Sequence, residues 1–139
     1  MKRKLVTIND KKIGDSENVK FIAELGVNHL GDFDRAIKMI DSAHKAGADF
    51  LKFQTYISEK RYDPKKNPKA KEFISNLKKW EFDRNKDKEI WDYARKIGAT
   101  VFTSPFDLDS LEFSEEMGSS AYKIAAFEMN NLKLLKEVI

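Results

Sequence analysis

The sequence predicts an α/β fold in which short strands alternate with longer helices along a parallel sheet. Strand-length runs and helical segments of ten or more residues follow one another, which is typical of repeated strand–helix units. Three glycines, Gly47, Gly98 and Gly118, each follow a segment with helical periodicity and precede a short strand-like run. Because a glycine just past a helix end can take the left-handed conformation that closes the last turn, these positions predict three helix-to-strand junctions.

Length and composition are those of one globular domain. Of the 139 residues, 41% are hydrophobic and 12% aromatic, which is enough apolar material for a core. The absence of cysteine excludes disulfides, zinc–thiolate sites and a thiol nucleophile. The net charge of +3 gives little support to nucleic-acid binding, and the sequence shows neither a signal-peptide core nor an apolar run of bilayer length. We therefore expect a cytoplasmic protein without nucleic-acid or membrane partners.

The amino-terminal residues predict a β-hairpin. Residues 4–8 pair with residues 12–14 in this prediction, and Asn9 with Asp10 supplies the turn chemistry. The strands of the main sheet are then expected at residues 21–27, 49–55, 100–103 and 121–126.

Helix caps and apolar spacing predict the helices. Asp32 is expected to cap a first helix, with His44 on its apolar face in the core or at its boundary. A second helix is expected over residues 85–97, and a third, with the weakest pattern, from Asp107.

Two further segments have unusual features. Residues 56–83 form a long connection whose amphipathic part, with Phe73 and Trp80, predicts an extra helix laid over the sheet. Asn130 is expected to cap a last helix over residues 131–139, and its apolar stripe still runs at the final residue. We expect this unit to be cut short.

Polar side chains interrupt strands that should be apolar. Glu24, Lys52 and Gln54 lie on adjacent predicted strands, and Ser104 and Lys123 occupy comparable places on the next two. A buried carboxylate or ammonium is costly unless it is paired, so one explanation is a structural ion pair between Glu24 and Lys52. The other is a substrate site at the carboxyl ends of the strands, where two lysines would suit a substrate with several negative charges.

Other candidate motifs carry less weight. The glycines at 26 and 31 lack the lysine of a P-loop, and their spacing does not fit a dinucleotide fingerprint. His29 is expected to have a turn or supporting role and not to ligate a metal. The lysine-rich stretch 60–88 is expected to be a solvated surface.

Four motifs taken together resemble the sialic acid synthase family, which includes N-acetylneuraminate, legionaminate and pseudaminate synthases. They occur in the right order and spacing, at residues 21–32, 46–55, 102–107 and 121–128. The resemblance implies a TIM-type (β/α)8 barrel, of which residues 21–139 would be the first four strand–helix units. Residues 1–20 would form the amino-terminal hairpin and lead-in.

The family resemblance also implies a reaction. Phosphoenolpyruvate condenses with an N-acylated amino sugar, such as N-acetylmannosamine or its 6-phosphate, to give a nine-carbon 2-keto acid used in cell-surface polysaccharide biosynthesis. A divalent metal, manganese or magnesium, polarises the sugar aldehyde, C3 of phosphoenolpyruvate attacks it, water adds at C2 and phosphate leaves.

Roles for individual residues follow from the same motifs. Glu24 resembles the carboxylate near the reacting end of the sugar, and Lys52 and Lys123 resemble the cations that hold phosphoenolpyruvate. The resemblance assigns substrate binding to Gln54, Ser104 and Glu128. Ala126 stands where the family has a serine, and the lost hydrogen bond would weaken phosphoenolpyruvate binding by about 1.5–3 kcal/mol.

The family's metal ligands are histidines on later strands, so the resemblance assigns none to this chain. It also implies a homodimer for the full-length protein, in which a carboxyl-terminal antifreeze-like domain reaches the partner's sugar site. The 139-residue chain alone is therefore expected to be inactive.

Two alternatives stand beside this reading. One is another phosphoenolpyruvate-condensing synthase of keto-deoxy sugar acids. The other is a non-catalytic, doubly wound module of the receiver or flavodoxin type, which would order its strands 2-1-3 instead of consecutively.

Overall fold

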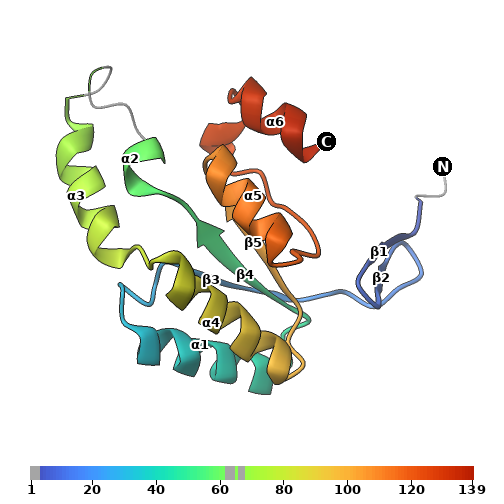
Figure 1. Ribbon diagram of the computed structural model, residues 1–139. Coiled ribbons are helices and arrows are strands. Elements are labelled where there is room, and N and C mark those ends of the chain that lie inside the picture. The colour runs from blue at the N-terminus through green and yellow to red at the C-terminus, as the bar shows by residue number, and fades with distance from the viewer. Residues whose placement is uncertain (1–3, 62–64, 66–67) are drawn as a thin grey trace.

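The computed structural model describes residues 4–61, 65 and 68–139, and its centre is a parallel sheet (Figure 1). The sheet contains β3 (Ile22–Gly26), β4 (Phe50–Thr55) and β5 (Val101–Pro105), hydrogen-bonded in the order β3-β4-β5. Spatial order thus follows chain order. This contradicts the 2-1-3 order that a receiver-like or flavodoxin-like module requires, so that alternative is wrong.

Three helices cover one face of the sheet. They are α1 (Phe33–Lys45), α4 (Arg84–Lys96) and α5 (Leu108–Glu116), with α1 and α4 side by side (Figure 1). The core between them and the sheet includes Leu25, Ile40, Leu51, Phe53, Ile90, Trp91, Ala94 and Val101. The opposite face of the sheet is the one that carries the predicted polar residues. Within the described ranges, no helix has the length and apolar character that crossing a membrane requires.

The predicted starts of α1 and α5 are confirmed by their caps, and α4 begins and ends one residue earlier than the helix predicted over residues 85–97. Asp32, Asp83 and Asp107 each accept a hydrogen bond from a backbone N–H in the first turn of α1, α4 and α5. The glycines that follow these helices, Gly47, Gly98 and Gly118, have φ values of 84°, 82° and 69°. His44 was expected in or beside the core, but it is exposed in the last turn of α1.

The amino-terminal hairpin is also confirmed. β1 (Val6–Ile8) pairs antiparallel with β2 (Lys11–Ile13), and Asn9 takes a left-handed φ of 52° in the turn. The two-residue loop matches the preference of asparagine and aspartate for such turns. In Figure 1 the hairpin lies beyond the amino-terminal ends of the sheet strands.

The long connection between β4 and α4 forms two helices, α2 (Ser58–Arg61) and α3 (Ala70–Trp80). Residues 62–64 and 66–67, part of the lysine-rich stretch, lie outside the described residues. The extra helix was predicted correctly but its position was not. Leu77 of α3 packs with Tyr56 and Phe106, which directly follow β4 and β5, so α3 covers the carboxyl end of the sheet and not its face.

The fourth predicted strand is reduced to one bridge. Tyr122 pairs in parallel with Thr103, and the Lys123 N–H donates to the Thr103 carbonyl at 3.0 Å. The chain then turns into a 3-10 helix (Ala126–Glu128), in which the Glu128 N–H bonds the Ala125 carbonyl. Asn131, one residue later than expected, caps α6 (Leu132–Val138).

Candidate functional site

The polar side chains predicted for the strands share the sheet face that the helices leave open. Glu24 stands opposite Lys52 in the β3–β4 register, and Gln54 stands opposite Ser104 in the β4–β5 register. Because side chains alternate along a strand, Lys52 and Gln54 point to the same side, away from Leu51 and the helices. The sequence pattern therefore placed these four residues correctly relative to one another.

Lys52 connects the strands at this face. The residue is only 7% exposed, and its ammonium group forms an ion pair with the Glu24 carboxylate. It also donates to the Ser104 Oγ at 3.2 Å, although Lys52 itself is level with Phe102. The side chain thus extends along the sheet and carries its charge toward the carboxyl end. The ion pair offered as a structural explanation exists, and it lies where a substrate site was predicted.

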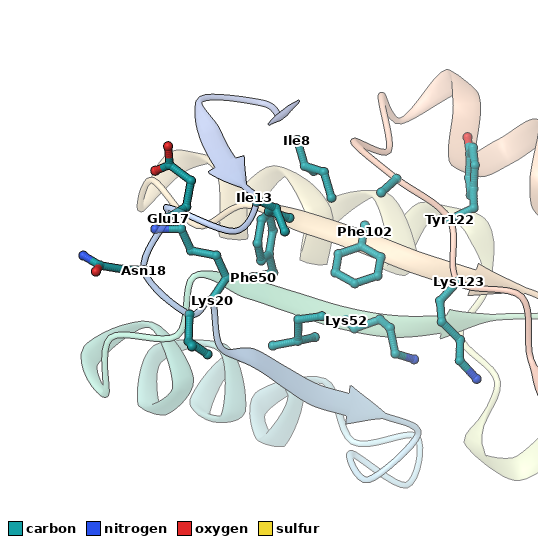
Figure 2. Close-up of a pocket in the computed structure, with 14 residues that line it drawn as sticks. Ile8, Ile13, Glu17, Asn18, Lys20, Phe50, Lys52, Phe102, Tyr122 and Lys123 are labelled. Atoms are coloured by element: carbon teal, nitrogen blue, oxygen red, sulfur yellow. The ribbon is translucent and has the colours of Figure 1, made fainter. Parts of the chain in front are cut away.

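Lys123 brings a second positive charge to the same cavity. Its residue is exposed, and the bridge between Tyr122 and Thr103 fixes its backbone beside β5. Figure 2 shows the Lys52 and Lys123 side chains reaching toward the same side of the cavity. Among the ion pairs of the described residues, none involves Lys123. This ammonium group is available to an anion.

The cavity has an apolar floor and a volume of about 700 Å³. Phe50 and Phe102 meet edge to face with ring centroids 6.0 Å apart, and both line it. Ile8 and Ile13 of the hairpin line it from the amino-terminal side (Figure 2). The hairpin thus closes the cavity at its amino-terminal end, and the two lysines lie toward the opposite end.

The side chains of Glu24 and Gln54 both lie beside Gly26 at the end of β3. The β3–β4 register shifts between Glu24 and Gly26, and Gly26 has a φ of 53°. No role in the site was predicted for Gly26. A glycine inside a strand pattern is a known sign of a bulge, so a signal was present.

Glu128 is held at the start of α6. The residue is 8% exposed, and its carboxylate accepts a hydrogen bond of 2.8 Å from the Asn131 Nδ2 at the start of α6. It is not among the residues that line the cavity, and Ala126 is exposed in the 3-10 helix.

His29 is a buried, neutral side chain in the loop after β3. Its ring stacks on Phe82 at 4.3 Å, and its Nδ1 accepts a hydrogen bond from the Gly31 N–H. Burial lowers the pKa of His29 to about 4, despite the opposing effect of Asp32. Within the described part of the chain, no three His, Cys, Asp or Glu side chains gather to hold a metal ion. The structure thus assigns His29 to loop packing.

Two carboxylates have contacts or a pKa that the sequence did not predict. Asp107 is buried and accepts from the Ile57 N–H at 2.8 Å, as well as from the N–H and hydroxyl of Ser110. It therefore ties the chain after β4 to α5. Burial raises the pKa of Asp87 to about 7, although Arg84 lies beside it. Of these contacts, the bond from Ile57 to Asp107 joins residues 50 positions apart, and only the fold brings it about.

Comparison with known proteins identifies the family. The NeuB family model matches residues 39–139, which is most of the chain and includes Lys52, Gln54, Ser104 and Lys123. The chain belongs to the NeuB family. NeuB relatives include the N,N'-diacetyllegionaminic acid synthase of Campylobacter jejuni, 36% identical over 126 residues, and the N-acetylneuraminate-9-phosphate synthase of Mus musculus, 31% identical over 133 residues. Both of these relatives are sugar acid synthases.

A solved structure of a NeuB relative has the same fold. It is the N-acetylneuraminic acid synthetase of Leptospira borgpetersenii in complex with citrate, which matches 96% of this chain with a TM-score of 0.85 and 34% identity. The match covers 45% of that protein. The chain spans 38% and 37% of the two curated relatives, with 84% and 90% of this chain aligned. The α/β fold is therefore that of part of a sialic acid synthase.

Proposed function

We propose that this chain carries the phosphoenolpyruvate-binding part of a NeuB-family sugar acid synthase. The observation that carries the proposal is that Lys52 and Lys123 line the same cavity and that the Ser104 hydroxyl accepts a hydrogen bond from the Lys52 ammonium group. Two ammonium groups and a hydroxyl are suitable partners for a ligand with a phosphate and a carboxylate. The fold of this NeuB member supports the assignment, because parallel-sheet proteins place ligands at the carboxyl ends of their strands.

The proposed reaction joins phosphoenolpyruvate to an N-acylated amino sugar. C3 of phosphoenolpyruvate forms a bond to the aldehyde carbon, whose oxygen takes up a proton. Water adds at C2, and breakage of the C2–O bond releases phosphate and leaves the 2-keto acid. Lys52 and Lys123 hold the phosphate and carboxylate throughout, and Ser104 donates to a phosphate oxygen.

Glu24 and Gln54 are proposed to contact the sugar beside its reacting carbon. The Glu24 side chain is half exposed and pairs with Lys52, so its second oxygen can accept from a sugar hydroxyl. Gln54 stands beside it and offers both a donor and an acceptor. Glu128 is proposed as a further substrate contact on the strength of the motif, although it lies outside the cavity lining.

The metal implied by the family would polarise the aldehyde when bound. The described residues offer no cluster of three potential ligands, so the roles proposed for this chain do not depend on a metal. Residues 21–139 are proposed as the first half of a (β/α)8 barrel, with residues 1–20 closing its floor. We propose that the complete protein is a cytoplasmic homodimer and that this chain alone forms no keto acid. Detection of keto-acid formation by the purified chain would overturn the last point.

Calorimetric titration with phosphoenolpyruvate tests the binding role. We expect Lys123→Met to weaken binding at least tenfold, because it removes an ammonium group that no described carboxylate neutralises. Lys133→Met removes the same charge from the exposed surface of α6 and should change the affinity less than twofold. Equal effects of the two substitutions would show that phosphoenolpyruvate responds only to net charge.

A further inference from the structure

The end of β3 contains a β-bulge at a glycine. The pairing with β4 is regular through Glu24 and Lys52 and then shifts, so that Gly26 stands beside Phe53. Gly26 takes a left-handed φ of 53° at this point. Bulges bend a strand and re-aim neighbouring side chains, and they are frequent beside active sites. The backbone here therefore controls where the polar side chains of β3 and β4 point.

The space over Gly26 is shared by two polar side chains. A Cβ atom at this position would lie 3.1 Å from the Glu24 Oε1 and 3.4 Å from the Gln54 Nε2. At Gly47, Gly98 and Gly118, which also have positive φ values, no atom comes within 4 Å of an added Cβ. Those glycines serve only the backbone conformation. Gly26 has in addition a spatial reason to lack a side chain.

We propose that Gly26 is a positioning residue of the sugar site. Its missing side chain lets the Glu24 carboxylate and the Gln54 carboxamide converge, and the open space between them admits a hydroxyl of a polyhydroxylated substrate. Gly26 acts through these two residues and contacts no reacting atom. The identity of the ligand rests on the proposed function, whereas the convergence of the two side chains does not.

The test compares Gly26→Ala with Gly98→Ala in the ¹⁵N-labelled chain by NMR. Both substitutions place an alanine at a left-handed position, but only the first adds a methyl group beside Glu24 and Gln54. We expect Gly26→Ala to shift the side-chain amide signals of Gln54, and Gly98→Ala to leave them in place. Unchanged Gln54 signals in a folded Gly26→Ala variant would overturn the proposal.

Ligand titrations then examine the sugar and phosphoenolpyruvate separately. N-Acetylmannosamine should perturb the Gln54 amide of the unmodified chain, and Gly26→Ala should weaken this response at least tenfold. Phosphoenolpyruvate should perturb the signals of Lys52 and Ser104 in both chains, with affinities that differ by less than twofold. Equal sugar binding by the two chains would overturn the role of Gly26. If the unmodified chain binds neither compound, the proposed function fails for this chain and the Gln54 signals alone decide the positioning role.

Stability measurements keep the proposal testable if Gly26→Ala folds poorly. The double variant Gly26→Ala/Gln54→Ala removes one of the two groups that the new methyl meets. We expect Gln54→Ala to lower the thermal midpoint less in the Gly26→Ala background than in the Gly98→Ala background, since substitutions at contacting residues are not additive. The same effect in both backgrounds would contradict a contact between residues 26 and 54.

Discussion

Lys52 keeps a positive charge inside the sheet because two neighbours compensate for the lost water. Glu24 neutralises its ammonium group and the Ser104 hydroxyl accepts one of its hydrogen bonds. Glu24 itself is half exposed, so its carboxylate can turn toward a ligand without being stranded in the core. A bound anion could then replace Glu24 as the partner of Lys52, which couples ligand binding to the release of a carboxylate.

Removing the Glu24 charge should make the stability of the chain depend more strongly on a bound anion. We expect Glu24→Gln to lower the free energy of unfolding by about 1–2 kcal/mol, less than for a fully buried pair because Glu24 is half exposed. Saturating phosphoenolpyruvate should raise the thermal midpoint of this variant more than that of the unmodified chain. Equal rises in the two midpoints would show that Lys52 does not change partner.

His29 should make stability fall in acid. Because the pKa of the folded state is about 4 and the ordinary value is 6.5, the unfolded chain binds this proton more tightly and stability is lost as the pH falls from 6.5 toward 4. His29→Asn keeps an acceptor for the Gly31 N–H but does not titrate there. As the pH falls from 7 to 5, the free energy of unfolding of this variant, measured with urea, should rise by about 2 kcal/mol relative to that of the unmodified chain. A difference in free energy of unfolding between the two chains that does not change with pH would show that burial does not lower the pKa of His29.

The titration of Asp87 should change the stability with pH in the opposite direction to that of His29. Its pKa of about 7 lies above the ordinary 3.8, so the folded chain holds the proton more tightly and loses stability as the pH rises from about 4 to 7. Asp87→Asn should therefore gain about 2–3 kcal/mol in free energy of unfolding, relative to the unmodified chain, as the pH rises from 5 to 8. Urea unfolding at several pH values measures this difference. A relative stability of Asp87→Asn that rises as the pH falls would contradict the raised pKa of Asp87.

At the scale of elements, Asp107 does more than cap α5. It also accepts from the Ile57 N–H, which follows β4. Asp107→Ala should cost about 2–4 kcal/mol, since it removes a cap and leaves a partly buried N–H unsatisfied. Asp83→Ala removes only the exposed cap of α4 and should cost about 1 kcal/mol. Similar losses in denaturant unfolding would show that the Ile57 bond adds nothing.

The sequence predicted most elements because their signals are local. The caps at Asp32 and Asp107 and the glycines at the helix ends act within one turn, so they could be recognised without the fold. The polar residues of the site were found because charge is unexpected in a parallel strand. The position of α3 could not be found in this way, since it depends on residues far along the chain. The glycine within β3 was a local sign of the bulge, but its pairing with β4 depends on the fold.

The fourth strand shows the limit of a local prediction. Residues 121–126 have the composition of a strand, but only Tyr122 pairs with β5, and Ala125 bonds the Glu128 N–H instead. Strand pairing requires neighbours, and β5 alone holds this segment among the described residues. The composition of a segment indicates its propensity to form a strand, but not whether a neighbouring strand is present to pair with it.

For the whole molecule, the open sheet face and edge predict self-association. β3 is an edge strand of the described sheet, and Ile22 on it is 55% exposed. We expect the chain to associate at micromolar concentrations in sedimentation velocity and Ile22→Lys to shift it toward the monomer, because a charge on an edge strand opposes pairing. Leu132→Lys, at an exposed position of α6, should have a smaller effect. Association that is insensitive to Ile22→Lys would place the contact elsewhere.

The central claim is that this chain binds phosphoenolpyruvate between Lys52, Ser104 and Lys123. Titration of the ¹⁵N-labelled chain with phosphoenolpyruvate, followed by NMR, tests it most directly. We expect saturable shifts of these three residues, with no comparable change at the surface cavity where Arg84 and Lys88 lie among Asp109, Glu112 and Glu116. Shifts centred on Arg84 and Lys88, or none at millimolar phosphoenolpyruvate, would contradict it.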